Sequence, residues 1–242
     1  MCLAVMRIKE IMTEEKDKKT EEQKEEKLPL KTRAAREAMS WFWVILAFLF
    51  IHGTIVQARV IPSESMVETL LVGDHLLVNR LGYDAEIPLT GKHWPLWRTP
   101  QRQQVVVFRS VQPNNADLVK RLIGMPGDTL EVREGAVWIN GRPLVEPYLY
   151  RPHSPGERFG PVVVPENHYF MMGDNRGNSL DSRYWGFVPR DHIIGTPLII
   201  YMSLDADPRA WEPGQLGARV SAYLGAIFKP SRIRWSRLFV TF

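Results

Sequence analysis

The chain has 242 residues, of which 45% are apolar, enough for one substantial domain with a hydrophobic core and an additional anchor segment. Its formal net charge of +4 is too small to predict nucleic-acid binding without other signals. Cys2 is the single cysteine, which excludes an intrachain disulfide and a cysteine-based metal site.

The first part of the chain is polar and charged. Residues 7 to 37 interleave Lys and Glu with few apolar groups. Such a stretch buries too little apolar surface to offset the entropy of ordering, so it predicts a solvated helix or a disordered segment. We assign residues 1–37 to this charged segment.

An apolar segment follows at residues 38–58. The run from Trp41 to Ile51 is unbroken, and with its flanks it reaches the roughly 20 residues that span a bilayer. A buried core helix is disfavoured because the run is not amphipathic. A cleavable signal peptide is the other alternative, since Val56-Gln57-Ala58 resembles a small-x-small cleavage site, but the preceding charged region is too long. We therefore predict an uncleaved transmembrane helix.

Charge on either side of this segment predicts its orientation. Four basic residues precede it closely, whereas Arg59 alone follows it. The more basic flank stays in the cytoplasm, so the N-terminus is expected inside and residues 59–242 outside. The basic residues before the segment are Lys27, Lys31, Arg33 and Arg36.

The remainder of the chain has a β pattern. Short runs rich in β-branched and aromatic residues are separated by turn dipeptides such as Asn140-Gly141, which predicts a hairpin. No repeats and no strand–helix alternation occur, so we expect a mainly antiparallel β domain with loops at 82–104 and 150–166. The expected strands include residues 76–78, 105–108, 130–132, 137–139 and 198–201.

The C-terminal tail, residues 229–242, mixes arginines with large apolar side chains. This composition fits an edge strand and a membrane-surface segment equally well. Both interpretations stay open at this stage.

Three segments carry candidate chemistry. Ser63 and Ser65 bracket one residue shortly after the apolar segment, and Lys120 lies in an apolar run that leads into a Gly/Pro turn. A lysine in such a run is costly unless its pKa falls, and a neutral amine is the general base that a serine nucleophile needs. The third segment, residues 171–186, is dense in small polar and charged groups, which suits either a turn network or a support for the Ser/Lys pair.

Together and in this order, the three segments strongly resemble bacterial type I signal peptidases. The matching patterns are Ser-x-Ser-Met, Lys-Arg-x-x-Gly-x-Pro-Gly-Asp and Gly-Asp-Asn-Arg-x-Asn-Ser-x-Asp-Ser-Arg-Tyr-Trp-Gly. The resemblance covers about residues 40 to 202. It implies a membrane-bound serine endopeptidase that removes signal peptides from exported preproteins. It also implies a signal-peptidase-like β catalytic domain at 59–242, with a small β-hairpin accessory insertion at about 129–168.

The resemblance also implies a role for each matching residue. Ser65 corresponds to the nucleophile, Lys120 to the general base, and Ser63 to the side chain that completes the oxyanion hole with the Ser65 backbone N–H. Ser179 corresponds to a serine that orients the lysine, and Asp181 and Arg183 to a charged pair that holds its loop. The shallow apolar pockets that give an Ala-x-Ala preference correspond to Ile61, Pro62, Met66, Leu70 and Val119.

The chain departs from the family pattern at three positions. Glu64 and Glu68 stand where Gly and Pro are frequent, and Gly177 replaces a frequent Asp. Because Glu64 lies between the two serines, its carboxylate is expected to point to solvent, since it would otherwise oppose an oxyanion. These departures keep two alternatives open: a Ser/Lys peptidase for a narrow pilin-like substrate, and a catalytically impaired membrane-anchored binding module.

Other chemistries find less support in the sequence. The histidines are scattered, none lies in a nucleophile-elbow context, and no His-x-x-x-His pair occurs, so a Ser-His-Asp or metal mechanism is not expected. We expect no cofactor and no metal. The expected partners are signal peptides of the Ala-x-Ala type and membrane lipid, with no nucleic acid. The expected location is the bacterial inner membrane, with the catalytic domain on its extracytoplasmic face.

Overall fold

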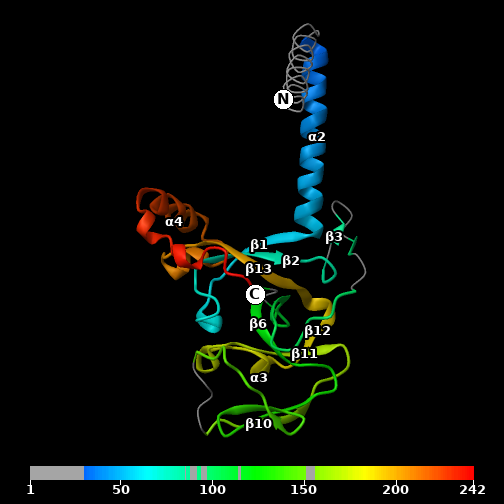
Figure 1. Ribbon diagram of the computed structural model, residues 1–242, viewed down its shortest axis with the longest axis vertical. Coiled ribbons are helices and arrows are strands. Elements are labelled where there is room, and N and C mark those ends of the chain that lie inside the picture. Colours follow the sequence, from blue (N-terminus) through cyan, green and yellow to red (C-terminus); the bar gives the residue numbers. More distant parts are fainter. Residues whose placement is uncertain (1–29, 85, 88–91, 94–96, 114–115, 151–155) are drawn as a thin grey trace, which may run out of the picture. The chain divides into compact units, whose positions relative to one another are not determined.

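The computed structural model describes residues 30–84, 86–87, 92–93, 97–113, 116–150 and 156–242 (Figure 1). The chain divides into two units, Met1–Leu49 and Phe50–Phe242. The charged run predicted for the N-terminus, with Cys2, lies outside the described residues up to position 29. From Leu30 onward the charged segment is already helical.

Helix α2 spans Leu30–Thr54, and its stretch Thr32–His52 is long and apolar enough to cross a membrane. The apolar side chains from Trp41 to Ile51 are exposed, as expected of a helix that is not part of a protein core. The helix ends earlier than the predicted boundary at residue 58. Val56, Gln57 and Ala58 instead belong to strand β1 (Val56–Val60), because their backbone groups pair with the next strand.

The second unit is built on a seven-stranded antiparallel sheet, which confirms the mainly β fold. Its strands, in spatial order, are β1, β2 (Asp74–Asn79), β13 (Ile193–Ser203), β5 (Val105–Arg109), β6 (Asp117–Gly124), β11 (His168–Met172) and β12 (Val188–Pro189). Strands β5 and β6 form a regular hairpin, in which Val106 faces Lys120 and Val107 faces Val119. The sheet thus brings Lys120 into the interior of the unit.

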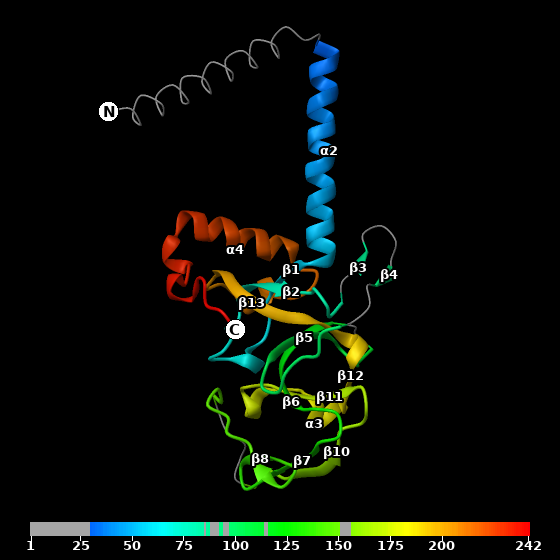
Figure 2. The same ribbon diagram turned by 45° about the vertical axis from the view of Figure 1, so that its right-hand side comes forward.

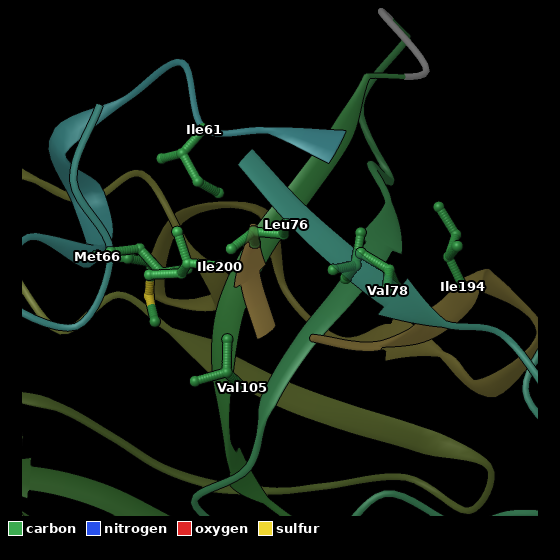
Figure 3. Packing of buried hydrophobic residues seen from close by; sticks show 9 residues of the cluster. Ile61, Met66, Leu76, Val78, Val105, Ile194 and Ile200 are labelled. Atoms are coloured by element: carbon green, nitrogen blue, oxygen red, sulfur yellow. The ribbon is translucent and has the colours of Figure 1, made fainter. Parts of the chain in front are cut away.

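One core cluster fixes the segment that follows β1. Ile61, Met66 and Leu70 are buried together with side chains from β2, β5 and β13. Figure 3 shows Ile61 and Met66 at one end of this group beside Ile200 and Leu76, with Val78 and Ile194 toward the other end. Burying an aliphatic side chain contributes about 1.5–3 kcal/mol, so the cluster holds the residues on both sides of Ser65 in place.

A smaller four-stranded sheet forms the predicted accessory insertion. Its order is β10 (Phe159–Val163), β7 (Thr129–Arg133), β8 (Ala136–Ile139) and β9 (Arg142–Pro143). The turn at Asn140 and Gly141 has positive φ at both residues, as a tight hairpin requires. Strand β10 lies inside the segment that the sequence predicts as a loop. It is an edge strand, where Pro161 is tolerated, and Phe159 packs on Phe170.

Two further short strands, β3 (Glu86–Ile87) and β4 (Lys92–His93), pair with each other inside the other predicted loop. Short helical turns connect the larger elements. They are η1 (Glu64–Met66), η2 (Arg176–Asn178), α3 (Ser182–Trp185), η3 (Arg190–His192), η4 (Pro208–Trp211), η5 (Pro230–Arg232) and η6 (Trp235–Arg237).

Helix α4 (Leu216–Phe228) is an element that the sequence interpretation missed. Ala222 and Ala226 are buried against Trp211, and the Tyr223 hydroxyl lies 2.8 Å from Nε2 of His75 on β2. The tail after α4 is not the continuous edge strand that was one of the two expectations. It consists of η5 and η6, with isolated bridges from Ile233 to Leu204 and from Thr241 to Ile199.

The tail is tied to the sheet by two arginines. Arg237 makes an ion pair with the fully buried carboxylate of Asp74 at 2.6 Å, and Arg234 donates to the Ser203 hydroxyl at 2.9 Å. Ser203 in turn donates to Asp74 at 2.6 Å. These contacts hold the irregular tail against strands β2 and β13.

Candidate active site

Ser65 is presented by the short turn η1 between β1 and β2. The Met66 side chain next to it is buried in the core, whereas Ser63 and Glu64 are exposed. The backbone carbonyl of Ser65 accepts a hydrogen bond from the Asn175 N–H at 3.0 Å. The Ser65 side chain is therefore held at a fixed position, at the boundary between the core and the surface.

Lys120 reaches this serine from the middle of β6. Its Nζ lies 2.5 Å from Ser65 Oγ, and the whole residue is 4% exposed. The two residues are 55 positions apart in the sequence, and the hairpin of β5 and β6 brings them together. A serine hydroxyl in contact with a buried amine has the geometry of a nucleophile with its base.

Burial lowers the pKa of Lys120 from its ordinary value to about 8. The carboxylates of Asp181 and Asp174 oppose this shift, because they favour the charged ammonium. Near neutral pH a substantial fraction of the amine is thus neutral and can accept a proton.

The predicted pair of Asp181 and Arg183 is formed. Arg183 Nε lies 2.8 Å from Asp181 Oδ1, and the two side chains are 4% and 0% exposed. Burial raises the pKa of Asp181, but hydrogen bonds and the charge of Arg183 outweigh it and hold that pKa below its usual value. Arg183 also donates to the backbone carbonyls of Arg176 and Ser179, so it closes the loop around these residues.

Ser179 lies in this loop with its hydroxyl buried. Within the part of the chain that the structure describes, Ser179 Oγ has no partner at hydrogen-bond geometry. It lies close enough to Asp181 to help lower the pKa of that carboxyl. The expected hydrogen bond from Ser179 to Lys120 is therefore not formed in this structure.

Gly173 brings the loop against the backbone of Ser65. A Cβ at this position would lie 2.3 Å from Ser179 Oγ and 2.5 Å from the Ser65 carbonyl oxygen. No side chain fits in that space, so glycine is required here for the close approach of two backbones. The Gly173 N–H donates to Asp181 at 3.1 Å, which links the glycine to the charged pair.

A second buried ion pair supports the site from the other side. Arg121, next to Lys120, donates through Nε to Asp174 at 2.8 Å, and Asp174 also accepts from Thr69 at 2.6 Å. This network joins β6, the segment after Ser65 and the loop after β11. Sequence reasoning did not assign roles to these three residues.

A cleft of about 460 Å³ opens beside Ser65 and Lys120. Four of the five residues predicted to bind substrate line it: Ile61, Pro62, Met66 and Val119. Leu70 does not line it and is fully buried in the core beneath. Across the cleft, Arg59 of β1 and Asp117 of β6 form an ion pair at 2.5 Å.

The family model described as signal peptidase, peptidase S26 matches residues 34–202. Probable signal peptidase I-2 of Synechocystis sp. is 37% identical over 189 residues, covering 70% of this chain and 80% of that protein. Signal peptidase I of Leptolyngbya laminosa is 38% identical over 181 residues, covering 72% and 77%.

This chain belongs to the signal peptidase family. The family match and the identity with these relatives identify it as a bacterial type I signal peptidase, which confirms the resemblance inferred from the three segments. A solved structure of a signal peptidase I from Enterococcus faecalis V583 has 39% sequence identity and a TM-score of 0.36. That match covers 41% of this chain and 97% of the other.

The unusual acidic residues of this signal peptidase leave the Ser/Lys pair unobstructed. Glu64 is exposed, and its carboxylate oxygen lies 3.5 Å from Asn178 Nδ2. The expectation that it points to solvent is thus met. Glu68 is also exposed, and it adopts a positive φ of 77° that proline could not adopt.

The signal peptidase site also contains residues that no motif predicted. Trp211, Pro213 and Arg219 line the cleft from η4, the turn after it and α4. The only sequence signal was the spacing of Leu216, Val220 and Leu224, which is that of one helix face. Among the described residues, no cluster of His, Cys, Asp and Glu is arranged to hold a metal ion.

Proposed function

We propose that this signal peptidase cleaves signal peptides with a Ser65/Lys120 dyad. The observation that carries this proposal is the 2.5 Å contact between Ser65 Oγ and a buried Lys120 amine. Burial lowers the pKa of that amine to about 8, which makes it an effective base near neutral pH.

The reaction proceeds in two stages. Ser65 Oγ attacks the scissile carbonyl while Lys120 accepts the hydroxyl proton, and Lys120 then gives that proton to the leaving amine. The resulting ester on Ser65 is hydrolysed by a water that Lys120 deprotonates, which releases the signal peptide and restores the serine. No cofactor takes part.

The oxyanion is stabilised by two donors, the Ser65 backbone N–H and the Ser63 hydroxyl. Ser63 Oγ lies 3.4 Å from Ser65 Oγ, close enough to reach an oxygen bound at the same carbon. One such donor is worth about 3 kcal/mol of barrier. Ser179 supports the base once its buried hydroxyl turns toward the Lys120 amine, since an unpaired buried hydroxyl costs about 1–3 kcal/mol.

The substrate lies as an extended peptide in the 460 Å³ cleft. β1 pairs with β2 on one side, and residues 117–119 of β6 pair only with β5. Among the described residues, the remaining edges of both segments have no strand partner and can bond a peptide backbone. Ile61, Pro62, Met66 and Val119 then form shallow pockets that suit small side chains, as in Ala-x-Ala, while Leu70 packs with Ile61 and Met66 in the core.

The peptidase is anchored in the bacterial inner membrane by α2. The apolar stretch Thr32–His52 crosses the bilayer once, and the basic residues at its start keep the N-terminus in the cytoplasm. The catalytic domain then lies on the extracytoplasmic face, where preproteins emerge. Val56-Gln57-Ala58 is protected from cleavage because β1 is paired along its whole length.

Helix α4 adds a second contact with lipid. Every third or fourth residue along one face is exposed and apolar, and Lys229 and Arg232 follow at its end. In both views of the second unit, α4 lies toward the end that holds β1, and β10 lies at the opposite end (Figures 1 and 2). An apolar face flanked by basic residues favours an interfacial helix. The exposed face comprises Leu216 (69%), Val220 (47%), Leu224 (50%), Ile227 (70%) and Phe228 (81%).

We expect a fluorophore on Phe228→Cys, in Cys2→Ser protein reconstituted into vesicles, to be quenched strongly by lipid-borne quenchers. The matched control is Val145→Cys, an equally exposed position two residues after strand β9 of the smaller sheet. Position 228 should be quenched several-fold more than position 145. Equal quenching at the two positions would contradict lipid contact by α4.

The activity is expected to rise with pH. Lys120 must be neutral to act as a base, and its pKa is about 8, so kcat/KM should increase about tenfold per pH unit below that value and level off above it. The measurement is a pH profile from 5.5 to 9.5 with a substrate that does not itself titrate. A flat profile would argue against Lys120 as the base.

The decisive test of the function is cleavage of a preprotein with an Ala-x-Ala site by the full-length protein in detergent, followed by N-terminal sequencing of the product. A cut after the second alanine in several unrelated preproteins supports a general signal peptidase. Cleavage of one pilin-like substrate alone would favour the narrow peptidase. No cleavage, with no labelling of Ser65 by an acylating inhibitor, would favour the binding module.

A further inference from the structure

A second cleft lies next to the Ser/Lys pair. Its volume is about 340 Å³, and it shares Ser63, Ser65, Leu118 and Lys120 with the larger cleft. Both clefts therefore open onto the same hydroxyl. A peptide whose scissile bond lies at Ser65 Oγ must place its two halves in these two spaces. The residues that line the second cleft alone are Glu64, Gln112, Asn178, Leu180 and Trp185.

The side chains that line each cleft indicate which part of the substrate peptide it binds. The larger cleft has apolar pockets and free strand edges, which suit the small residues before the bond, as the proposed function requires. The second cleft adds the polar side chains Glu64, Gln112 and Asn178 to the apolar Leu180 and Trp185, which suits the varied side chains that follow the bond. The first residues of the mature protein, which follow the cleaved bond, therefore lie in the second cleft.

Glu64 gives this second cleft its charge. Among the described lining residues, Glu64 and Lys120 are the only ionisable groups, and Lys120 is buried and neutral when it acts as a base. The Glu64 segment is fixed, because its backbone carbonyl accepts from Asn175 Nδ2 at 3.3 Å and its carboxylate contacts Asn178 Nδ2 at 3.5 Å. The Glu64 carboxylate thus lies at a defined position beside the part of the substrate that follows the cleaved bond.

We propose that Glu64 makes this peptidase prefer substrates with a lysine or arginine among the first two residues after the cleaved bond. The side chain is exposed and its field is screened by water, so the effect is that of a surface ion pair, about threefold to tenfold in kcat/KM. An acidic residue at the same position is disfavoured by a similar factor.

Three preproteins that differ only in the second mature residue (Lys, Gln or Glu) test this inference with the full-length protein in detergent. Wild type should cleave them in the order Lys, Gln, Glu, with the extremes differing at least about tenfold at low salt. The Glu64→Gln variant should reduce the Lys-to-Glu ratio to near one, and 0.5 M salt should reduce the ratio in wild type.

The matched control is Glu68→Gln, which removes an exposed acidic side chain of the same turn that lines neither cleft. This variant should keep the wild-type ratio. An equal ratio in wild type and Glu64→Gln would overturn the inference while leaving the Ser/Lys mechanism intact. Failure of wild type to cleave the Gln preprotein would instead overturn the proposed function, and this inference with it.

Discussion

Replacing Ser65 by alanine or Lys120 by methionine is expected to lower kcat at least about 10⁴-fold, because each change removes a group that bonds or exchanges a proton with the substrate. The two variants should be about equally impaired, since a nucleophile and its base act as one unit. The double variant should be no worse than either single one. The measurement is single-turnover cleavage of an Ala-x-Ala preprotein.

Stability separates loss of chemistry from loss of fold in these variants. Lys120 is 4% exposed, so methionine removes the cost of a buried polar group and should leave the free energy of unfolding unchanged or higher. Ser110→Ala is a matched control, because Ser110 is buried but lines neither cleft. A folded Lys120→Met protein with more than a tenth of wild-type activity would exclude the proposed base.

Replacing Arg183 by methionine is expected to lower the free energy of unfolding by about 3–5 kcal/mol, because it leaves the buried Asp181 carboxylate without its counter-ion. The loop from Gly173 to Asp181 should loosen, since Arg183 bonds two of its carbonyls. Activity should therefore fall even at temperatures where the protein stays folded. Denaturant unfolding and cleavage assays on the same preparation measure both effects.

The control for Arg183 is Arg209→Met. Arg209 pairs with Asp207 at 3.5 Å, but both side chains are largely exposed, at 80% and 59%. Exposed pairs contribute at most about 1 kcal/mol, so this change should have a small effect on stability and none on cleavage. Similar losses of unfolding free energy in the two variants would show that burial does not increase the contribution of the Arg183 ion pair to stability.

Lys120 and residues 171–186 could be selected from the sequence because they break local rules, whereas Ser65 was selected through the resemblance of the three segments to a known family. Lys120 places an amine in an apolar strand, and residues 171–186 concentrate polar groups beyond the needs of a loop. The strands around Val106 and Val137 were predicted correctly because their β-branched runs are short and bounded by turns. The dense polar segment proved to hold the Asp181–Arg183 pair that encloses Gly173.

The missed features depend on contacts between distant residues. Trp211 and Arg219 reach the cleft through η4 and α4, far along the chain from Ser65, and no local pattern marks that meeting. Strand β10 forms because its backbone pairs with β7, although Gly160 and Pro161 alone predict a loop. The helix end at Thr54 likewise follows from the pairing of β1 with β2, whereas composition alone favoured continuing to residue 58.

The ion pair between Arg237 and Asp74 has a consequence for the order of biosynthesis. Asp74 lies on the strand that follows Ser65 and is fully buried, whereas its partner Arg237 comes after every named strand in the sequence and is synthesised after them. Until then a buried carboxylate lacks its counter-ion, which costs several kcal/mol. The domain that holds Ser65 and Lys120 therefore reaches its full stability only once Arg237 has been synthesised and has folded back onto β2.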